Sequence, residues 1–457
     1  MDTQHIINLD KTYVWHPFTP NDLWLDSEFE PIVIAEGIGS TLVDTKGKRY
    51  LDGNSSIWTN LHGHSHPQIR QAIKNQVDAI AHSSFLGLTN TQAPLLAERL
   101  CSLTGLDRCF FSDDGSTAME AALKMVIQFF QQTDQKERTR VVSLSSAYHG
   151  DTVGAMSMGN SKLFHRHYKS VLFPVSEVKA PSCYRCPHNK AIPQKEESRS
   201  CRKCQFECLD SVEKAFAEIQ KEAAIFAIEP KVQGAAGFAM QPKGYLKKST
   251  SIARQAGAKI VLDEVMTGFG RTGSTFAFQQ EDLMPDVVAL AKGLTGGTLP
   301  LAVTLCSQEI FNGFSGGVEN TFFHGHSYTG NPLGCAVARA SLSILESPES
   351  KKARKLIQST LEEEKKVFWE HPHVGDVRQE GLILAVELVK DVETREPFPY
   401  EKRLGAAVCQ EAAKHGLLTR PVGDVLVLMP PYSSTAEQVR EMVTILSKSI
   451  ETTFASL

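Results

Sequence analysis

The sequence has no hydrophobic run of membrane-spanning length and no excess of positive charge. None of its apolar segments approaches the roughly 18 residues that cross a bilayer, and its first residues lack the apolar stretch of a secretory signal. The formal net charge is -4, and no stripe of Lys and Arg interleaved with aromatic residues provides a surface for nucleic acid. We therefore expect a cytoplasmic protein that binds neither membranes nor nucleic acid.

Internal repeats and low-complexity tracts are also absent. The chain has 457 residues, of which 42% are hydrophobic and 22% are charged, so it is long enough for two domains with substantial cores. We expect a large central domain over residues 71–336 and a smaller α+β domain over residues 337–457. The N-terminal segment 1–70 is expected to join the smaller domain.

Cysteine is not scarce, but its ten occurrences in a chain of this length do not suggest a disulfide scaffold, which is typical of small secreted domains. The two Cys-x-x-Cys pairs of one polar, proline-containing segment, 183–208, have a spacing that also occurs in tetrahedral zinc sites. Either a bound metal or a structural surface insertion explains this segment, and we expect no metal at the reaction centre. The cysteines of the segment are Cys183, Cys186, Cys201, Cys204 and Cys208.

Short apolar runs alternate with segments of helical periodicity in the middle of the chain, which predicts an α/β sheet. Between residues 117 and 130, apolar residues recur at helical spacing and would cover one face of that sheet. Further helices are expected at 401–416 and from Thr435 onwards. The expected strands are 109–111, 141–144, 225–228, 259–262 and 287–291.

Chemically active residues follow each of these expected strands. Ligands of open α/β sheets bind beyond the carboxyl ends of the strands, so these residues are expected to meet at one edge. Singly, each has an ordinary explanation, such as a small-residue turn, a packing tyrosine, a helix-capping carboxylate or a lysine at the exit to solvent. In chain order they are Gly115 with Ser116, Tyr148 with His149, Glu229, Asp263 with Glu264, and Lys292.

Taken together, these groups match what pyridoxal 5'-phosphate requires of a protein. A lysine amine forms a Schiff base with this cofactor, and a carboxylate keeps its pyridine nitrogen protonated so that the ring acts as an electron sink. An aromatic side chain can lie on the ring, and the free N–H groups at a helix start can hold the phosphate. The sequence therefore predicts a pyridoxal phosphate site at one edge of the sheet.

Longer motifs resemble the class III aminotransferases, a family of pyridoxal phosphate enzymes of fold type I. They are SSAYHGDT (145–152), DEVMTGFGRTG (263–273), LAKGLTGG (290–297) and FFHGHSYTGNPLGCA (322–336), and the resemblance extends over nearly the whole chain. It implies an aspartate-aminotransferase-like fold, with a mixed, mostly parallel sheet in the large domain and a smaller α+β domain. It also implies a homodimer in which both chains build each active site.

The resemblance implies a role for each candidate site residue. Lys292 would carry the cofactor and move protons, Asp263 would pair with the pyridine nitrogen, and Tyr148 would stack on the ring. Arg420 would bind the carboxylate of the keto acid, which suits its forked guanidinium. The other implied cofactor contacts are Gly115, Ser116, Glu229, Val265 and, toward the phosphate of the neighbouring subunit, Ser327; the other implied substrate contacts are Phe18, Ile57, Trp58 and Gly325.

Three further motifs narrow the resemblance within the class. WHPFT (15–19), DGNSSIWTNLHGH (52–64) and LLTRPVGDVLVLMPP (417–431) are similar to those of members that convert 8-amino-7-oxononanoate to 7,8-diaminononanoate in biotin biosynthesis. Members that take the amino group from S-adenosylmethionine carry a tyrosine and a tryptophan where this chain has Phe18 and Ile57. The amino donor is therefore S-adenosylmethionine or lysine, and these two residues favour lysine.

Two other classes of function stay open at this point. Another class III enzyme, such as an ω-amino acid or diamine transaminase or a semialdehyde aminomutase, would share the cofactor motifs but not the WHPF and TRPVGDV strings. A binding protein of the same fold, organised by the cysteine segment, would not need Lys292 and Asp263.

Overall fold

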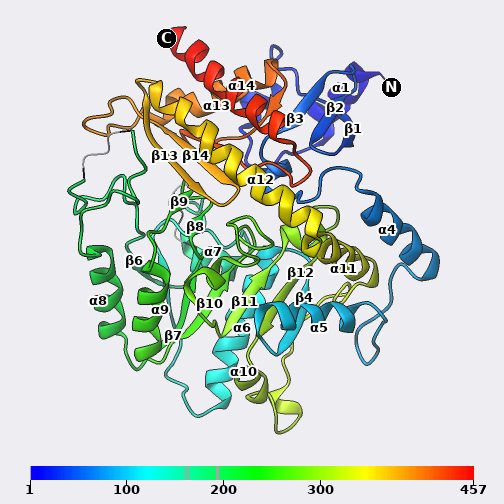
Figure 1. The fold of residues 1–457 in the computed structure, drawn as a ribbon. Coiled ribbons are helices and arrows are strands. Elements are labelled where there is room, and N and C mark those ends of the chain that lie inside the picture. The colour runs from blue at the N-terminus through cyan, green and yellow to red at the C-terminus, as the bar shows by residue number, and fades with distance from the viewer. Residues whose placement is uncertain (1, 160, 162–163, 192–194, 457) are drawn as a thin grey trace.

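The computed structural model describes residues 2–159, 161, 164–191 and 195–456. Within this part of the chain the largest sheet has seven strands in the order β4-β12-β11-β10-β7-β5-β6 (Figure 1). β12 runs antiparallel to both of its neighbours, whereas the other pairs are parallel, which confirms the expected mixed, mostly parallel sheet. These strands are β4 (Arg108–Ser112), β5 (Arg140–Leu144), β6 (Ser176–Val178), β7 (Ala223–Ile228), β10 (Lys259–Asp263), β11 (Val287–Leu290) and β12 (Ala302–Cys306).

Side chains that alternate along the strands divide the core into two layers. In β10, Ile260 and Leu262 belong to one buried cluster, and Val261 belongs to the cluster on the opposite face. The helix α6 (Gly115–Gln132), predicted from its periodicity, covers the Val261 face. The opposite face packs against α5 (Ala93–Thr104), α8 (Asp210–Glu218), α9 (Tyr245–Gln255) and α11 (Pro332–Glu346).

The two ends of the chain meet in a smaller unit. β15 (Leu417–Leu418) pairs in parallel with β3 (Arg49–Asp52), which is itself the third strand of an N-terminal antiparallel ribbon. Both termini accordingly lie at the same end of the molecule (Figure 1). The expected division after residue 336 falls inside α11. The other elements of this unit are β1 (Ile34–Ile38), β2 (Thr41–Asp44), β13 (Val374–Glu380), β14 (Ile383–Leu388), β16 (Val425–Leu428), α12 (Pro348–Glu364), α13 (Leu404–Lys414) and α14 (Ala436–Ala455).

Short elements complete the chain between these units. They are α1 (Thr3–Tyr13), α2 (Asn21–Leu25), α3 (Ser55–Trp58), α4 (Pro67–Ala79), α7 (Val153–Met158), α10 (Gln308–Asn312), β8 (Val232–Gln233) and β9 (Ala239–Met240).

The described parts of the cysteine segment, 183–191 and 195–208, pack against the sheet of β13, β14 and β16. The Ser198 hydroxyl donates to Asp376 over 3.1 Å, and the Arg199 guanidinium pairs with Glu380 at 2.7 Å. All ten cysteines are free thiols, and in the described ranges no three His, Cys, Asp or Glu side chains are grouped so that they could hold a metal ion. These contacts favour the structural interpretation of the segment.

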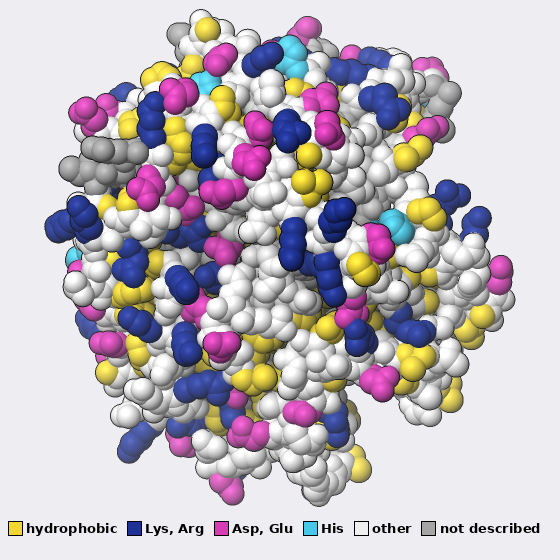
Figure 2. All heavy atoms as spheres, in the orientation of Figure 1, with side chains coloured by type: hydrophobic (Ala, Val, Ile, Leu, Met, Phe, Trp, Pro, Cys, Tyr) yellow, Lys and Arg dark blue, Asp and Glu magenta, His cyan; other side chains and the backbone are white. Residues whose placement is uncertain are grey.

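Charges of both signs are mixed on the surface. Figure 2 shows Lys and Arg interspersed with Asp and Glu over the face that it displays, so no extended field of one sign forms there. None of the helices in the part of the chain that the structure covers is long and apolar enough to cross a membrane.

Arg378 of β13 is a buried cation that joins this small sheet to the central part of the chain. Its guanidinium pairs with Glu387 at 2.6 Å and with Asp376 at 3.2 Å, and it donates to the backbone carbonyl of Phe238 over 2.8 Å. Removing one partner of a buried ion pair leaves charge without compensation.

We predict that Arg378→Ala lowers the free energy of unfolding by about 3–5 kcal/mol, because the buried Asp376 loses its cation and the buried Glu387 keeps only its pair with Arg185. Urea denaturation of the variant measures this loss. Arg440→Ala is the control, because Arg440 pairs with Glu364 on an exposed face and should cost about 1 kcal/mol or less. Equal losses in the two variants would contradict the view that Arg378 stabilises the fold as a buried ion-pair partner.

Candidate active site

A cavity of about 2810 Å³ opens at the carboxyl edge of the central sheet and extends to the N-terminal strands and α13. Every candidate site residue lines it except Gly325 and Ser327, which lie in an exposed loop outside it. The strand order explains this convergence, because β11, β10 and β7 are parallel neighbours whose carboxyl ends share one edge. The lining candidates are Phe18, Ile57, Trp58, Gly115, Ser116, Tyr148, Glu229, Asp263, Val265, Lys292 and Arg420.

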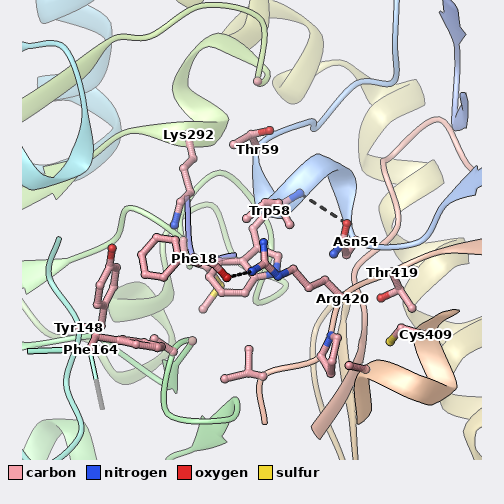
Figure 3. A pocket seen from close by; sticks show the side chains of 18 of the residues that line it. Phe18, Asn54, Trp58, Thr59, Tyr148, Phe164, Lys292, Cys409, Thr419 and Arg420 are labelled. Carbon is pink, nitrogen blue, oxygen red and sulfur yellow. Dashed lines mark hydrogen bonds between the residues drawn. The ribbon is translucent and has the colours of Figure 1, made fainter. Parts of the chain in front are cut away.

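Lys292 follows the end of β11 and directs its amine into this cavity (Figure 3). The amine lies 5.0 Å from the centroid of the Trp58 ring. Burial lowers the pKa of Lys292, the negative charges of Asp263 and Glu229 oppose this shift, and the positive charge of Arg271 adds to it. The backbone of Lys292 is left-handed, with φ at 45°, a conformation that is uncommon outside glycine.

Asp263, the last residue of β10, forms a buried pair with His149. Its Oδ2 lies 2.8 Å from Nδ1 of His149, and its Oδ1 accepts a hydrogen bond from the Val265 backbone over 3.1 Å. Burial opposes protonation of His149, but the hydrogen bond and charge of Asp263 outweigh burial and raise the pKa of the imidazole. Sequence reasoning assigned no role to His149, although its position beside Tyr148 was a signal.

The two acids beyond β7 and β10 have different surroundings. The Glu229 carboxylate accepts the backbone N–H groups of Tyr148 and Gly234 over 3.3 and 3.0 Å, and burial raises its pKa to about 7. Glu264 is fully buried away from the cavity and accepts the Thr267 hydroxyl over 2.5 Å. Glu229 therefore faces the site, and Glu264 serves the local backbone.

The start of α6 forms a cradle suited to an anion. Asp114 caps the helix by accepting the Thr117 backbone N–H over 3.0 Å, whereas no described group accepts the N–H of Gly115 or Ser116. A Cβ at Gly115 would lie 2.7 Å from the Val265 side chain, so only glycine fits this approach. Free N–H groups at a helix N-terminus hold phosphate in many proteins.

The groups present fit pyridoxal phosphate. Lys292 would supply the covalent attachment, Asp263 would face the pyridine nitrogen, and the start of α6 would hold the phosphate. The Nε2 atom of His149 is buried and has no hydrogen-bond partner in the described structure. The polar groups behind Asp263 can therefore form one more hydrogen bond.

Aromatic side chains line the outer part of the cavity. The Phe164 ring packs edge-on against Phe18, with centroids 5.5 Å apart, and against Tyr148, with centroids 6.1 Å apart (Figure 3). Sequence reasoning missed Phe164, because the loop that carries it has no periodicity and no motif. Phe164 thus adds a third aromatic ring beside Phe18 and Tyr148 in the lining of the cavity.

Arg420 extends into the cavity from the segment after β15 (Figure 3). Its guanidinium donates to the backbone carbonyl of Phe18 over 3.4 Å, and no carboxylate of the described residues pairs with it. Its side chain is exposed, so the fork is free to receive an anionic ligand.

The turn α3, which carries Ile57 and Trp58, is left-handed throughout. The φ angles of Ser55, Ser56, Ile57 and Trp58 are 53°, 50°, 62° and 67°. A left-handed conformation costs roughly 1–2 kcal/mol for each L-residue, and a β-branched residue such as Ile57 is an outlier there. The turn is held by contacts from outside it, and such strain is typical of functional sites.

Solved structures of pyridoxal phosphate enzymes have this fold. An amine transaminase from an uncultivated Pseudomonas species, in its PLP-bound form, is 31% identical, with a TM-score of 0.87 and coverage of 97% of this chain and 98% of that one. The fold and the gathered groups define a pyridoxal-phosphate-dependent aminotransferase.

The chain belongs to the class III aminotransferases, whose family model (aminotransferase class-III) matches residues 26–450. It is 47% identical to the adenosylmethionine-8-amino-7-oxononanoate aminotransferase of Geobacter sulfurreducens, over 99% of this chain and 98% of that protein. The crystal structure of adenosylmethionine-8-amino-7-oxononanoate aminotransferase from Methanocaldococcus jannaschii is 38% identical, with a TM-score of 0.90 and 99% of each chain covered. The enzyme is thus a transaminase with pyridoxal phosphate as its cofactor.

We predict that the cofactor-free protein captures pyridoxal phosphate at a rate that rises with pH through a midpoint below 10.5, the ordinary value for lysine. The neutral amine is the form that attaches the cofactor, and burial lowers the pKa of Lys292. Stopped-flow absorbance at a series of pH values measures the midpoint.

Glu229→Gln provides the control for this measurement. Its carboxylate raises the pKa of Lys292, so its removal should move the midpoint to still lower pH. A midpoint at or above 10.5 in the unaltered protein would show that the Lys292 amine is not held as we describe.

Proposed function

We propose that this enzyme transfers an amino group to the keto carbon of 8-amino-7-oxononanoate and forms 7,8-diaminononanoate for biotin biosynthesis. The supporting observation is that one cavity contains the Lys292 amine beside Trp58 and the Arg420 guanidinium beside Phe18, with apolar side chains between them (Figure 3). The keto acid carries its carboxylate and its keto carbon at separate positions along a methylene chain. Relatives at 38–47% identity over nearly the full chain are named for this reaction.

The chain's own residues would divide the work as follows. Bound pyridoxal phosphate supplies the electron sink that stabilises negative charge at the reacting carbon. Asp263 would keep a proton at the pyridine nitrogen, and His149 would support the Asp263 carboxylate by hydrogen bonding. The Lys292 amine would take the proton from the amino-bearing carbon of the donor and return a proton to the keto carbon of the acceptor. Tyr148 and Val265 would limit the movement of the ring.

We propose S-adenosylmethionine as the amino donor, and this revises the preference for lysine drawn from Phe18 and Ile57. The names of the relatives specify adenosylmethionine. A sulfonium cation is attracted to aromatic faces by about 0.5–2 kcal/mol. Phe164, which packs against both Phe18 and Tyr148, supplies an aromatic ring in the cavity in which Ile57 replaces the tryptophan of other members.

The decisive experiment gives the purified holoenzyme 8-amino-7-oxononanoate with each donor separately and follows 7,8-diaminononanoate by mass spectrometry. We expect product with S-adenosylmethionine and little with lysine. Phe164→Ala should raise the KM for S-adenosylmethionine roughly 2- to 30-fold, the range of one cation–π contact, and Phe164→Leu controls for lost apolar bulk. Product with lysine but not with S-adenosylmethionine would contradict the proposed donor. The absence of product with either donor would contradict the proposed acceptor.

Arg420→Ala should reduce kcat/KM for the keto acid because the substrate carboxylate loses its bidentate partner. A hydrogen bond to a charged group contributes about 1.5–3 kcal/mol, which corresponds to roughly 10- to 160-fold. Steady-state kinetics with the keto acid as the varied substrate measures the loss. Arg403→Ala removes the same charge from another part of the cavity and should have a smaller effect on kcat/KM. Equal losses in the two variants would indicate that only the overall positive charge of the cavity matters, and not a carboxylate site at Arg420.

We also propose that the enzyme works as a homodimer in the cytoplasm. Gly325 and Ser327 lie outside the cavity of their own chain, in a loop that also exposes 73% of Phe323 and 53% of Tyr328. Exposed apolar residues beside a candidate phosphate ligand suit an interface in which Ser327 serves the partner's site. Ten free thiols agree with a reducing compartment. Sedimentation equilibrium that finds only monomers would contradict the dimer.

A further inference from the structure

Arg271 lies in the GFGRTG segment, and sequence reasoning gave it no role. Its side chain is only 1% exposed, and no carboxylate of the described residues pairs with it. Buried arginine is normally paired with an acid, because an isolated charge is costly to remove from water. This guanidinium is therefore stabilised by the polar groups that it contacts and by the Tyr432 ring, whose centroid lies 5.2 Å away.

Those contacts surround the left-handed turn α3. The Arg271 guanidinium donates to the hydroxyl oxygen of Ser55, the first residue of the turn, over 3.1 Å, and to the backbone carbonyl of Asn60, just after the turn, over 2.9 Å. It also donates to the Pro430 carbonyl over 3.4 Å, and the Ser55 hydroxyl donates to the Met429 carbonyl over 2.6 Å. Arg271 thus ties both ends of α3 to the segment that follows β16.

The turn determines where the Trp58 ring lies. Trp58 is the last residue of α3, its ring packs edge-on against Phe238 with centroids 5.1 Å apart, and the Lys292 amine lies 5.0 Å from its ring centroid. A right-handed turn at residues 55–58 would direct this side chain elsewhere, because φ sets the direction of each Cα–Cβ bond.

We propose that Arg271 is a positioning residue for the transamination. It holds α3 in the left-handed conformation, and through α3 it holds the Trp58 ring beside the Lys292 amine. Its effect on the reaction is therefore exerted through the turn rather than by contact with substrate.

The test compares Arg271→Lys with Arg271→Lys/Ser56→Gly in the holoenzyme. Lysine keeps the charge but lacks the fork that spans Ser55 and Asn60. Glycine at position 56 adopts a left-handed backbone without strain, and the Ser56 side chain does not line the cavity. The substitution removes the 2.8 Å hydrogen bond from the Ser56 hydroxyl to Asp52, but it keeps the 2.8 Å bond from the backbone N–H of the same residue to that carboxylate. We expect Arg271→Lys to bind a full complement of cofactor but to lose at least tenfold in kcat, with a weaker circular dichroism signal in the visible band of the cofactor. The double variant Arg271→Lys/Ser56→Gly should have at least a threefold higher kcat than Arg271→Lys and should recover part of the dichroism signal.

Arg354→Lys is the matched control, because Arg354 lies 5.6 Å from the same Tyr432 ring that Arg271 approaches at 5.2 Å but has no contact with α3. It should keep kcat and the dichroism signal. If Arg271→Lys does not fold, Ser55→Ala with and without Ser56→Gly replaces it, since Ser55→Ala removes one acceptor and leaves Arg271 in place. The proposal is overturned if kcat is unchanged, if Ser56→Gly restores nothing, or if Arg354→Lys loses as much.

Discussion

The removal of the Lys292 amine from water at the end of β11 is the constraint on which the rest of the site depends. Burial favours the neutral amine, and the carboxylates of Asp263 and Glu229 oppose that effect. Asp263 ends β10 and Glu229 follows β7, and these are the next two strands in the sheet order, so parallel pairing alone brings both acids to the same edge as the lysine. The strand order of the sheet is therefore what places the lysine and the two acids in one site.

Part of the backbone strain in this protein lies around the same cavity. Phe18, Lys292 and all four residues of α3 have left-handed backbones, and none of them is glycine. Such conformations persist only where surrounding contacts determine them, and here buried polar contacts to Asp52, Met429 and Arg271 surround α3. The left-handed conformation of α3 is therefore held by tertiary contacts from β3, from the segment after β16 and from Arg271, and not by local propensity.

Sequence reasoning located most of the fold and much of the candidate site, for a definite physical reason. A buried parallel strand is a short apolar run, and the residue after it must lie at the ligand-binding edge, so Glu229, Asp263 and Lys292 could be placed from the pattern alone. β12 was not anticipated, because an antiparallel strand that returns after a short loop breaks the alternation of strands and helices. Phe164 and Arg271 were missed because their roles depend on tertiary contacts that no local pattern encodes.

The pairing of β15 with β3 affects how the protein can be made. The bond from the Lys48 ammonium to the Lys414 carbonyl, beside this pairing, spans 366 residues of chain. At a synthesis rate of about 5–20 residues per second, the N-terminal ribbon waits roughly 20–70 s on the ribosome before its fourth strand emerges. Throughout that interval the free edge of β3 is open to pairing with another chain. The N-terminal ribbon is therefore the part of the nascent protein that most needs protection, although it is among the first parts to be synthesised.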